Sequence, residues 1–197
     1  LFVDGRYTLQ APAQVDEGAF TVVPLAETSP EKWIEAHLAK GQSLGFDPWR
    51  TTLGGRERLA RAVAAAGGIL VPVEDDPLAA VWTDRPDPPV APIRLLDAAV
   101  AGEPTGAKLR QVREVLAREK VDGALISDPH ATAWLFNIRG ADVAHTPLPL
   151  SWSIVPLENP PLLFIDDAKL SDEARDALSA VAHLHAPDEL DETLAAF

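Results

Sequence analysis

Residues 133–155 read AWLFNIRGADVAHTPLPLSWSIV, and this stretch carries three kinds of local pattern in succession. Residues 131–138 form a short apolar helix or turn that stops at Gly140. A loop over residues 139–149 follows, and residues 151–157 are a run of small and β-branched residues typical of a buried strand. The helix is expected to turn its large apolar side chains toward the interior, namely Trp134, Leu135 and Phe136.

The loop places Arg139, Asp142 and His145 between apolar neighbours. Removing such groups from water costs several kcal/mol unless each finds a partner. Loops that hold polar residues in fixed positions are more often functional than loops in general. A structural interpretation stands beside the functional one: Asn137, Arg139 and Asp142 satisfy one another and stabilise a corner between helix and strand.

Composition limits the classes of function. The chain has 197 residues, enough for one large or two small domains, and its net charge is −13. A field of this sign repels nucleic acid and anionic membrane surfaces, so we expect neither as a partner. The sequence has no cysteine, hence no disulfide and no thiolate ligand or nucleophile. No apolar run approaches the ~20 residues that a membrane helix needs.

Strand-like and helix-like patterns alternate in both halves, which predicts α/β units whose sheets are covered by helices. Predicted strands cover residues 1–10 (with a turn at Gly5), 20–25, 43–46, 69–73, 124–127, 151–157, 162–165 and 182–184. Predicted helices cover residues 13–17, 30–41, 53–66, 76–82, 103–120, 131–138 and 171–181, with a last one beginning at Asp188.

Four prolines lie close together between the two halves: Pro86, Pro88, Pro89 and Pro92. Proline at this density excludes helix and central strand. We therefore expect an extended linker over residues 83–93, between a first domain at 1–82 and a second at 94–197.

Three stretches together resemble the Xaa-Pro aminopeptidase (aminopeptidase P) family of the creatinase/prolidase "pita-bread" superfamily. WLFNIRGADV at 134–143 is similar to the family's second-domain signature, while VDGRYTLQA at 3–11 and VWTDRP at 81–86 agree in order and approximate spacing. The match covers essentially the whole chain. One departure is AHTP at 144–147, where the family more usually shows His-Asn-Pro.

The resemblance implies two creatinase/prolidase N-terminal-like domains with a ribonuclease H-like motif, their mixed sheets flanked by helices and both truncated. It implies the non-catalytic N-terminal portion of a cytoplasmic, homodimeric enzyme that removes the N-terminal residue from peptides with proline second. In the family, two divalent metals, usually manganese, are held by two Asp, one His and two Glu of a later catalytic domain. This chain has no His-x-x-x-Gly-His run, so alone it is expected to be inactive and to hold no metal.

Two groups of residues are expected to face the substrate. Arg6 follows Gly5, which permits a tight turn, and its guanidinium could grip a peptide carbonyl or carboxylate. A plain surface pair with Asp4 is the structural alternative. The resemblance implies that the Arg of Asp-Gly-Arg-Tyr reaches the bound peptide, a role carried to Arg6 and its neighbour Tyr7. The second group is the signature loop, with Asn137, Arg139, Asp142 and His145.

Other patterns indicate no chemistry of their own. His183 and His185 are more typical of a strand or surface than of a chelate, and Ser127-Asp128-Pro129-His130 is better explained as a strand exit and helix cap than as a catalytic triad. Two alternatives remain open. One is a related prolidase- or creatinase-type hydrolase, and the other is a free-standing peptide-binding or dimerisation module.

Overall fold

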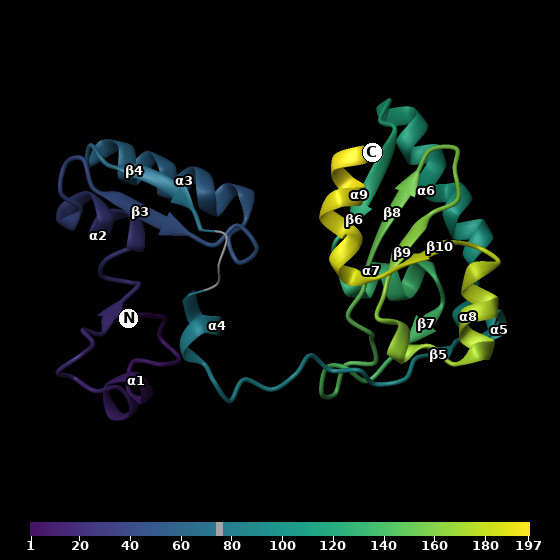
Figure 1. Cartoon of the computed structure of the whole chain (residues 1–197), viewed down its shortest axis with the longest axis horizontal. Helices are drawn as coiled ribbons and strands as arrows, with labels where there is room; N and C mark the ends of the chain where they lie inside the picture. Colours follow the sequence, from purple (N-terminus) through teal and green to yellow (C-terminus); the bar gives the residue numbers. More distant parts are fainter. Residues whose placement is uncertain (74–76) are drawn as a thin grey trace. The chain divides into compact units, whose positions relative to one another are not determined.

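A computed structural model describes residues 1–73 and 77–197, and the chain divides into two compact units, Leu1–Arg85 and Pro86–Phe197 (Figure 1). The division falls inside the proline-rich stretch. The helix predicted over 76–82 is seen as α4, Pro77–Val81, while its expected first residue Asp76 lies outside the described residues.

The first unit is built on two small parallel sheets. In one, β1 pairs with β2, and in the other β3 pairs with β4. Its elements before α4 are β1 (Phe2–Val3), α1 (Gln10–Gln14), β2 (Val23–Pro24), α2 (Pro30–His37), β3 (Ser43–Phe46), α3 (Leu53–Ala65) and β4 (Ile69–Pro72).

Caps and a small apolar core define the two main helices of this unit. Ser29 caps α2 by accepting from the Lys32 N–H at 3.3 Å, and Thr52 caps α3 in the same way. Buried core residues link α2 with α3, and partly buried leucines from the helices and from β3 and β4 pack against them. The buried members are Ile34, Ala62 and Val63.

The second unit contains a four-stranded mixed sheet in the order β10-β9-β8-β6. Strands β6, β8 and β9 are antiparallel neighbours, and β10 joins β9 in parallel. Its strands are β5 (Arg94–Leu95), β6 (Gly123–Ile126), β7 (Ile138–Arg139), β8 (Trp152–Pro156), β9 (Leu162–Phe164) and β10 (His183–His185). Its helices are α5 (Ala98–Ala101), α6 (Thr105–Glu119), α7 (Pro129–Leu135), η1 (Asp167–Lys169), α8 (Asp172–Ser179), η2 (Pro187–Glu189) and α9 (Leu190–Ala196).

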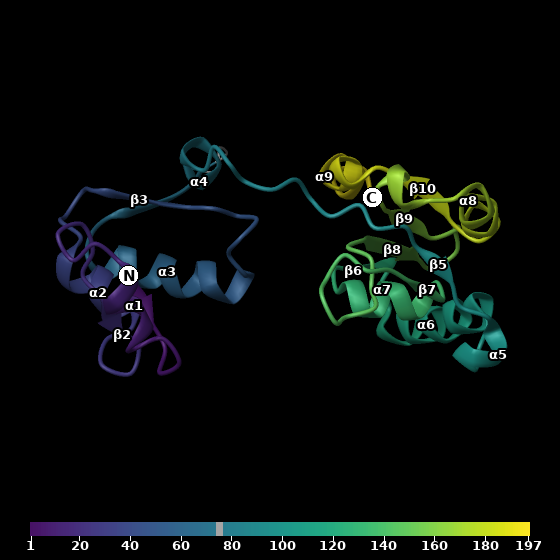
Figure 2. The same ribbon diagram turned by 90° about the horizontal axis from the view of Figure 1, so that it is seen from below.

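The alternation of side chains along the sheet separates two apolar layers. Val155 of β8 and Leu163 of β9 face a large core shared with α6, α7 and α8. Their neighbours Ile154 and Phe164 face the other way and meet Leu190 of α9. Helices α6 and α9 therefore lie on opposite sides of the sheet (Figure 2). The predicted α/β class with mixed sheets and covering helices is confirmed.

Several local predictions are corrected. The first strand does not continue to residue 10, because the Asp4 carboxylate accepts from the Arg6 N–H at 2.9 Å and the Asp4 carbonyl accepts from the Tyr7 N–H, which forms a turn. The helix predicted at 13–17 begins earlier, at Gln10. The side chain of Trp134 does not point fully inward, since the residue is 47% exposed.

Candidate functional site

Helix α7 leads into the signature segment, residues 134–143. It ends at Leu135, before residue 138 where the apolar pattern predicts its end. Asp128 caps it by accepting from the His130 N–H at 2.9 Å, and this bond is the main cause that holds the pKa of Asp128 below its usual value. The helix ends before Asn137, whose φ of 53° is left-handed. The chain then enters β7, which pairs antiparallel with β5, so residues 138–139 are strand rather than helix.

Asn137 is buried, and both the oxygen and the nitrogen of its side-chain amide form hydrogen bonds. Its Oδ1 accepts from the Lys108 ammonium at 2.6 Å, and its Nδ2 donates to the Glu103 carbonyl at 2.8 Å. Lys108 is only 2% exposed and also donates to the Trp134 carbonyl at 2.7 Å. These bonds join α6 to the end of α7. Asn137 therefore has a complete structural role in this unit.

Lys108 belongs to α6, and its side chain extends to Trp134 and Asn137 of the signature segment. Burial is the first cause that lowers the pKa of its ammonium, and the positive charge of Arg139 is the second. Its Nζ also lies 4.4 Å from the centroid of the Trp134 ring, which is a cation–π geometry. Trp134 therefore packs part of its ring against the Lys108 ammonium, although the residue is 47% exposed.

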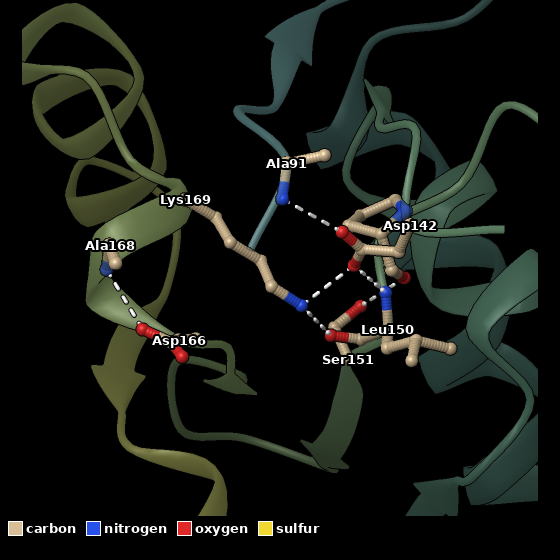
Figure 3. A network of polar contacts seen from close by, with 8 residues as sticks. Ala91, Asp142, Leu150, Ser151, Asp166, Ala168 and Lys169 are labelled. Atoms are coloured by element: carbon tan, nitrogen blue, oxygen red, sulfur yellow. Dashed lines mark hydrogen bonds and ion pairs between the residues drawn. The ribbon is translucent and has the colours of Figure 1, made fainter. Parts of the chain in front are cut away.

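Asp142 forms a buried ion pair with Lys169, at 2.7 Å from Oδ2 to Nζ, and the two side chains are 0% and 5% exposed. Its carboxylate also accepts from the N–H groups of Ala91 and Leu150, at 3.1 and 2.7 Å. Lys169 donates in addition to the Leu150 carbonyl (Figure 3). One carboxylate thus joins the end of the proline-rich stretch, the signature loop and η1.

Gly140 explains why the two ends of the loop meet. A Cβ placed on Gly140 would lie 2.7 Å from the Pro149 nitrogen, so only glycine admits this approach of backbone to backbone. The loop is closed at its base by this contact and by Asp142.

Arg139 lines a surface hollow of about 180 Å³. One guanidinium nitrogen, Nη1, donates to the carbonyls of Ile138 and Ala133, at 2.8 and 3.3 Å. In the described part of the chain these two carbonyls are its hydrogen-bond partners, and no carboxylate pairs with it. The other residues of the hollow are His130, Ala133, Trp134, Thr146, Pro147 and Leu148.

His145 lies at the exposed tip of the loop with a left-handed φ of 60°. The adjacent Thr146, which departs from the family's usual Asn, donates its hydroxyl to the Ala144 carbonyl at 3.4 Å and lines the hollow. The structure thus brings Arg139 and Thr146 to one hollow, and places His145 outside its lining.

Arg6 and Tyr7 lie in the turn after β1. Two guanidinium nitrogens of Arg6 hold the Asp4 carboxylate, the shorter contact being 2.6 Å, and this hydrogen bond is the main cause that lowers the pKa of Asp4. Arg6 also lies 5.8 Å from the centroid of the Tyr7 ring. The Arg6 side chain remains 79% exposed, so the surface pair orients the guanidinium without covering it.

The idea that Asn137, Arg139 and Asp142 satisfy one another is wrong. Asn137 is held by Lys108 and Asp142 by Lys169, two buried lysines that sequence reasoning missed. Lys108 had a recognisable signal, because it lies four and eight residues before Val112 and Leu116, on the apolar face of α6. Lys169 follows two aspartates near a helix start and carries no comparable signal.

Within residues 1–73 and 77–197, no His, Asp or Glu side chains gather in a group of three or more that could hold a metal ion. Over the same residues, no helix combines the length and apolar character required to cross a membrane.

Comparison with known proteins assigns the class. The model of the creatinase/prolidase N-terminal domain matches residues 84–197, more than half of the chain, and the chain therefore belongs to that family. Its relatives are aminopeptidases P. A probable Xaa-Pro aminopeptidase P from Pyricularia oryzae is 33% identical over 178 residues, which cover 88% of this chain and 29% of that protein. Aminopeptidase P1 from Lotus japonicus is 31% identical, with 98% and 31% covered.

A solved structure extends the likeness to the whole chain. The crystal structure of X-prolyl aminopeptidase from Caenorhabditis elegans, described as a cytosolic enzyme with a di-nuclear active site, aligns with a TM-score of 0.88 at 29% identity. The alignment covers 98% of this chain and 32% of that one. The chain thus spans about three-tenths of the length of the relatives it matches. The resemblance read from the sequence is confirmed.

Proposed function

We propose that this chain is the N-terminal, non-catalytic portion of an Xaa-Pro aminopeptidase, an enzyme that removes the N-terminal residue from peptides with proline second. The observation that carries the proposal is the likeness to the C. elegans enzyme, which extends over 98% of this chain at a TM-score of 0.88. The aminopeptidase P relatives, matched at 31–33% identity, support the same substrate class.

In this proposal the chain shapes the substrate cleft of a catalytic pita-bread domain in the same protein. Arg6 and Tyr7 contact the peptide, and the exposure of the Arg6 guanidinium supports that role. The signature loop borders the cleft. Arg139 and His145 provide its accessible polar groups, while Asn137 and Asp142 hold the loop in shape through their buried lysines.

Two divalent ions, manganese in our proposal, would be held by the catalytic domain, outside this chain, and would supply there the activation of water for peptide hydrolysis. The di-nuclear site of the C. elegans relative supports two metals. The description of that relative as cytosolic supports a cytoplasmic enzyme. We also propose a homodimer, to which this portion contributes.

The test is a peptidase assay on the natural protein that contains this chain, supplied with Mn²⁺. We expect release of the first residue from an Xaa-Pro-Xaa tripeptide and none from the matched Xaa-Ala-Xaa peptide. Cleavage of Xaa-Pro dipeptides alone would contradict the proposal in favour of a prolidase-type hydrolase. Loss of all cleavage, with peptide binding kept, would favour a free-standing binding module.

A further inference from the structure

The hollow beside α7 combines a cation with an apolar wall. Arg139 contributes the guanidinium, and Trp134, Pro147 and Leu148 contribute flat or apolar surfaces. A hollow of about 180 Å³ has room for roughly six water molecules at the liquid volume of each. It is thus smaller than a site for a whole drug-sized ligand and suits one amino-acid residue.

The guanidinium of Arg139 has no carboxylate partner in the described part of the chain, whereas His130 of the same hollow pairs with the Asp128 carboxylate at 3.1 Å. Arg139 binds two backbone carbonyls, and Lys108 binds a carbonyl and an amide oxygen. Neither forms an ion pair with any residue the structure describes. Lys108 contacts the ring of Trp134, which lines the hollow together with Arg139. The hollow therefore has one cation in its lining and a second one behind its aromatic wall.

The surrounding chain makes this arrangement unusual. Its net charge is −13, and acidic side chains outnumber basic ones by 30 to 17. Arg139 and the buried Lys108 ammonium are neighbouring cations, and low-dielectric walls focus their positive potential into a cleft. The Glu103 carboxylate acts on Lys108, and the Asp128 carboxylate pairs with His130 at the hollow. Burial first and the positive charge of Arg139 second lower the pKa of Lys108, and the second cause agrees with the proximity of the two cations.

The geometry of the guanidinium selects among anions. Hydrogen bonds from Nη1 to the carbonyls of Ile138 and Ala133 fix its plane, and leave the Nε and Nη2 donors without a partner in the described chain. A planar fork of this kind matches a carboxylate, which it can bind in a bidentate way. The apolar wall beside it suits a side chain carried on the same carbon atom as the carboxylate.

We propose that the hollow formed by Trp134, Arg139, Thr146 and Pro147 binds the C-terminal carboxylate of a peptide together with its last, apolar side chain. Arg139 receives the carboxylate, while Trp134 and Pro147 receive the side chain. The inference rests on the proposed function in that it assigns a ligand to the loop said to border the substrate cleft.

The direct test is a calorimetric titration of the full chain with N-acetyl-L-leucine, with N-acetyl-L-leucinamide as the uncharged match. We expect a Kd on the order of 1 mM for the acid, as for other small fragments. The amide should bind about ten- to one-hundredfold more weakly, the range expected for losing a hydrogen bond to a charged group. Equal binding of acid and amide, or no binding of the acid by the folded chain, would overturn the proposal.

Two variants assign the effect to Arg139. Arg139→Ala should weaken binding of the acid about tenfold or more and leave the amide unchanged. Arg110→Ala removes an equal charge from an exposed position of α6 and should change neither. If Arg139→Ala does not fold, Arg139→Lys keeps the charge without the fork and should still bind the acid more weakly than the original chain. An unchanged affinity in the folded Arg139 variant overturns the proposal.

This experiment is separable from the peptidase assay. Failure of the titration leaves cleavage of Xaa-Pro peptides by the natural protein unaffected. Loss of that cleavage, with selective binding of the acid retained, contradicts the proposed function while the carboxylate site stands.

Discussion

The two units of the molecule bury their side chains to different degrees. In the first, the core cluster consists of Ile34, Ala62 and Val63, with Val3 and Ala11 buried apart from it. Ile69 on the small β3–β4 sheet is 58% exposed. In the second, two cores lie on opposite faces of a four-stranded sheet. Because apolar burial is the main stabilising term, the second unit should be the more stable.

The same contrast applies to the polar residues predicted to form a site. Arg6 and Tyr7 of the first unit are exposed, whereas Asn137 and Asp142 of the second are buried with complete partners. Burial with satisfied hydrogen bonds is typical of a structural role, and exposure leaves a group available to a ligand. The difference favours Arg6, Tyr7 and Arg139 as the groups that can contact a ligand.

The largest effect is expected at the ion pair of the second unit. Lys169→Ala leaves the Asp142 carboxylate buried without its cation and should cost about 3–5 kcal/mol in the free energy of unfolding. The matched change in the first unit is Arg58→Ala, which removes the exposed pair with Glu31 at 3.1 Å and should cost only about 0.2–1 kcal/mol. Urea denaturation measures both, and equal costs would contradict the contrast between the units.

Core truncation gives the next largest effect. Leu163→Ala in the large core should cost about 2–5 kcal/mol, because Leu163 is fully buried. Val63→Ala in the small core should cost about 1.5 kcal/mol, at roughly 0.8 kcal/mol for each lost methyl group. Fluorescence of variants that keep the tryptophans of one unit alone separates the units, since Trp33, Trp49 and Trp82 lie in the first and Trp134 and Trp152 in the second. A first unit that unfolds at higher urea than the second would refute the ranking.

Helix caps should give smaller and similar effects in both units. Ser171 caps α8 by accepting from the Ala174 N–H at 3.2 Å, as Ser29 caps α2. Replacing either serine with alanine should lower the unfolding free energy by about 1 kcal/mol, because one N–H loses its acceptor. Thermal denaturation of the two variants measures this, with serine-to-glycine variants as controls that should lose only a few tenths of a kcal/mol.

The smallest effect concerns the exposed pair of Asp4 and Arg6. Its hydrogen bond lowers the pKa of Asp4, so any stability it adds is present above the ordinary value of 3.8 and is lost as pH falls through the lower, folded value. Because both groups are exposed, Asp4→Asn should leave the urea midpoint at neutral pH unchanged.

Carbon-13 NMR titration of the Asp4 carboxyl should give a pKa below 3.8, and Arg6→Ala should move it back toward that value. A titration that does not respond to Arg6→Ala would show that the pair does not orient Arg6.

Regular elements were predictable where local chemistry decides them. Ser29 before Pro30 marked the start of α2, and the turn before Leu162 marked the hairpin of β8 and β9. The corner after α7 was not predictable, because the left-handed backbone at Asn137 is stabilised by Lys108, 29 residues away. Likewise, no local pattern showed that Asp142 would meet Lys169, since that contact depends on the packing of η1 against the loop.

The candidate site residues also divide into those found from a local pattern and those that depend on distant contacts. Arg6 and Tyr7 were found from a short motif that also makes its own turn, and their contact with a substrate stays a prediction. The hollow at Arg139 arises from α7 and the far end of the loop, which only the close approach of Gly140 to Pro149 brings together.

The most direct test is the effect of Arg6→Ala on the natural protein that contains this chain. We expect kcat/KM for an Xaa-Pro tripeptide to fall about ten- to one-hundredfold, as for loss of a hydrogen bond to a charged group, while the urea midpoint stays the same. Arg61→Ala, at an exposed position of α3, should leave kcat/KM unchanged. An Arg6→Ala enzyme with the original kcat/KM would contradict the assignment of substrate contact to the first unit.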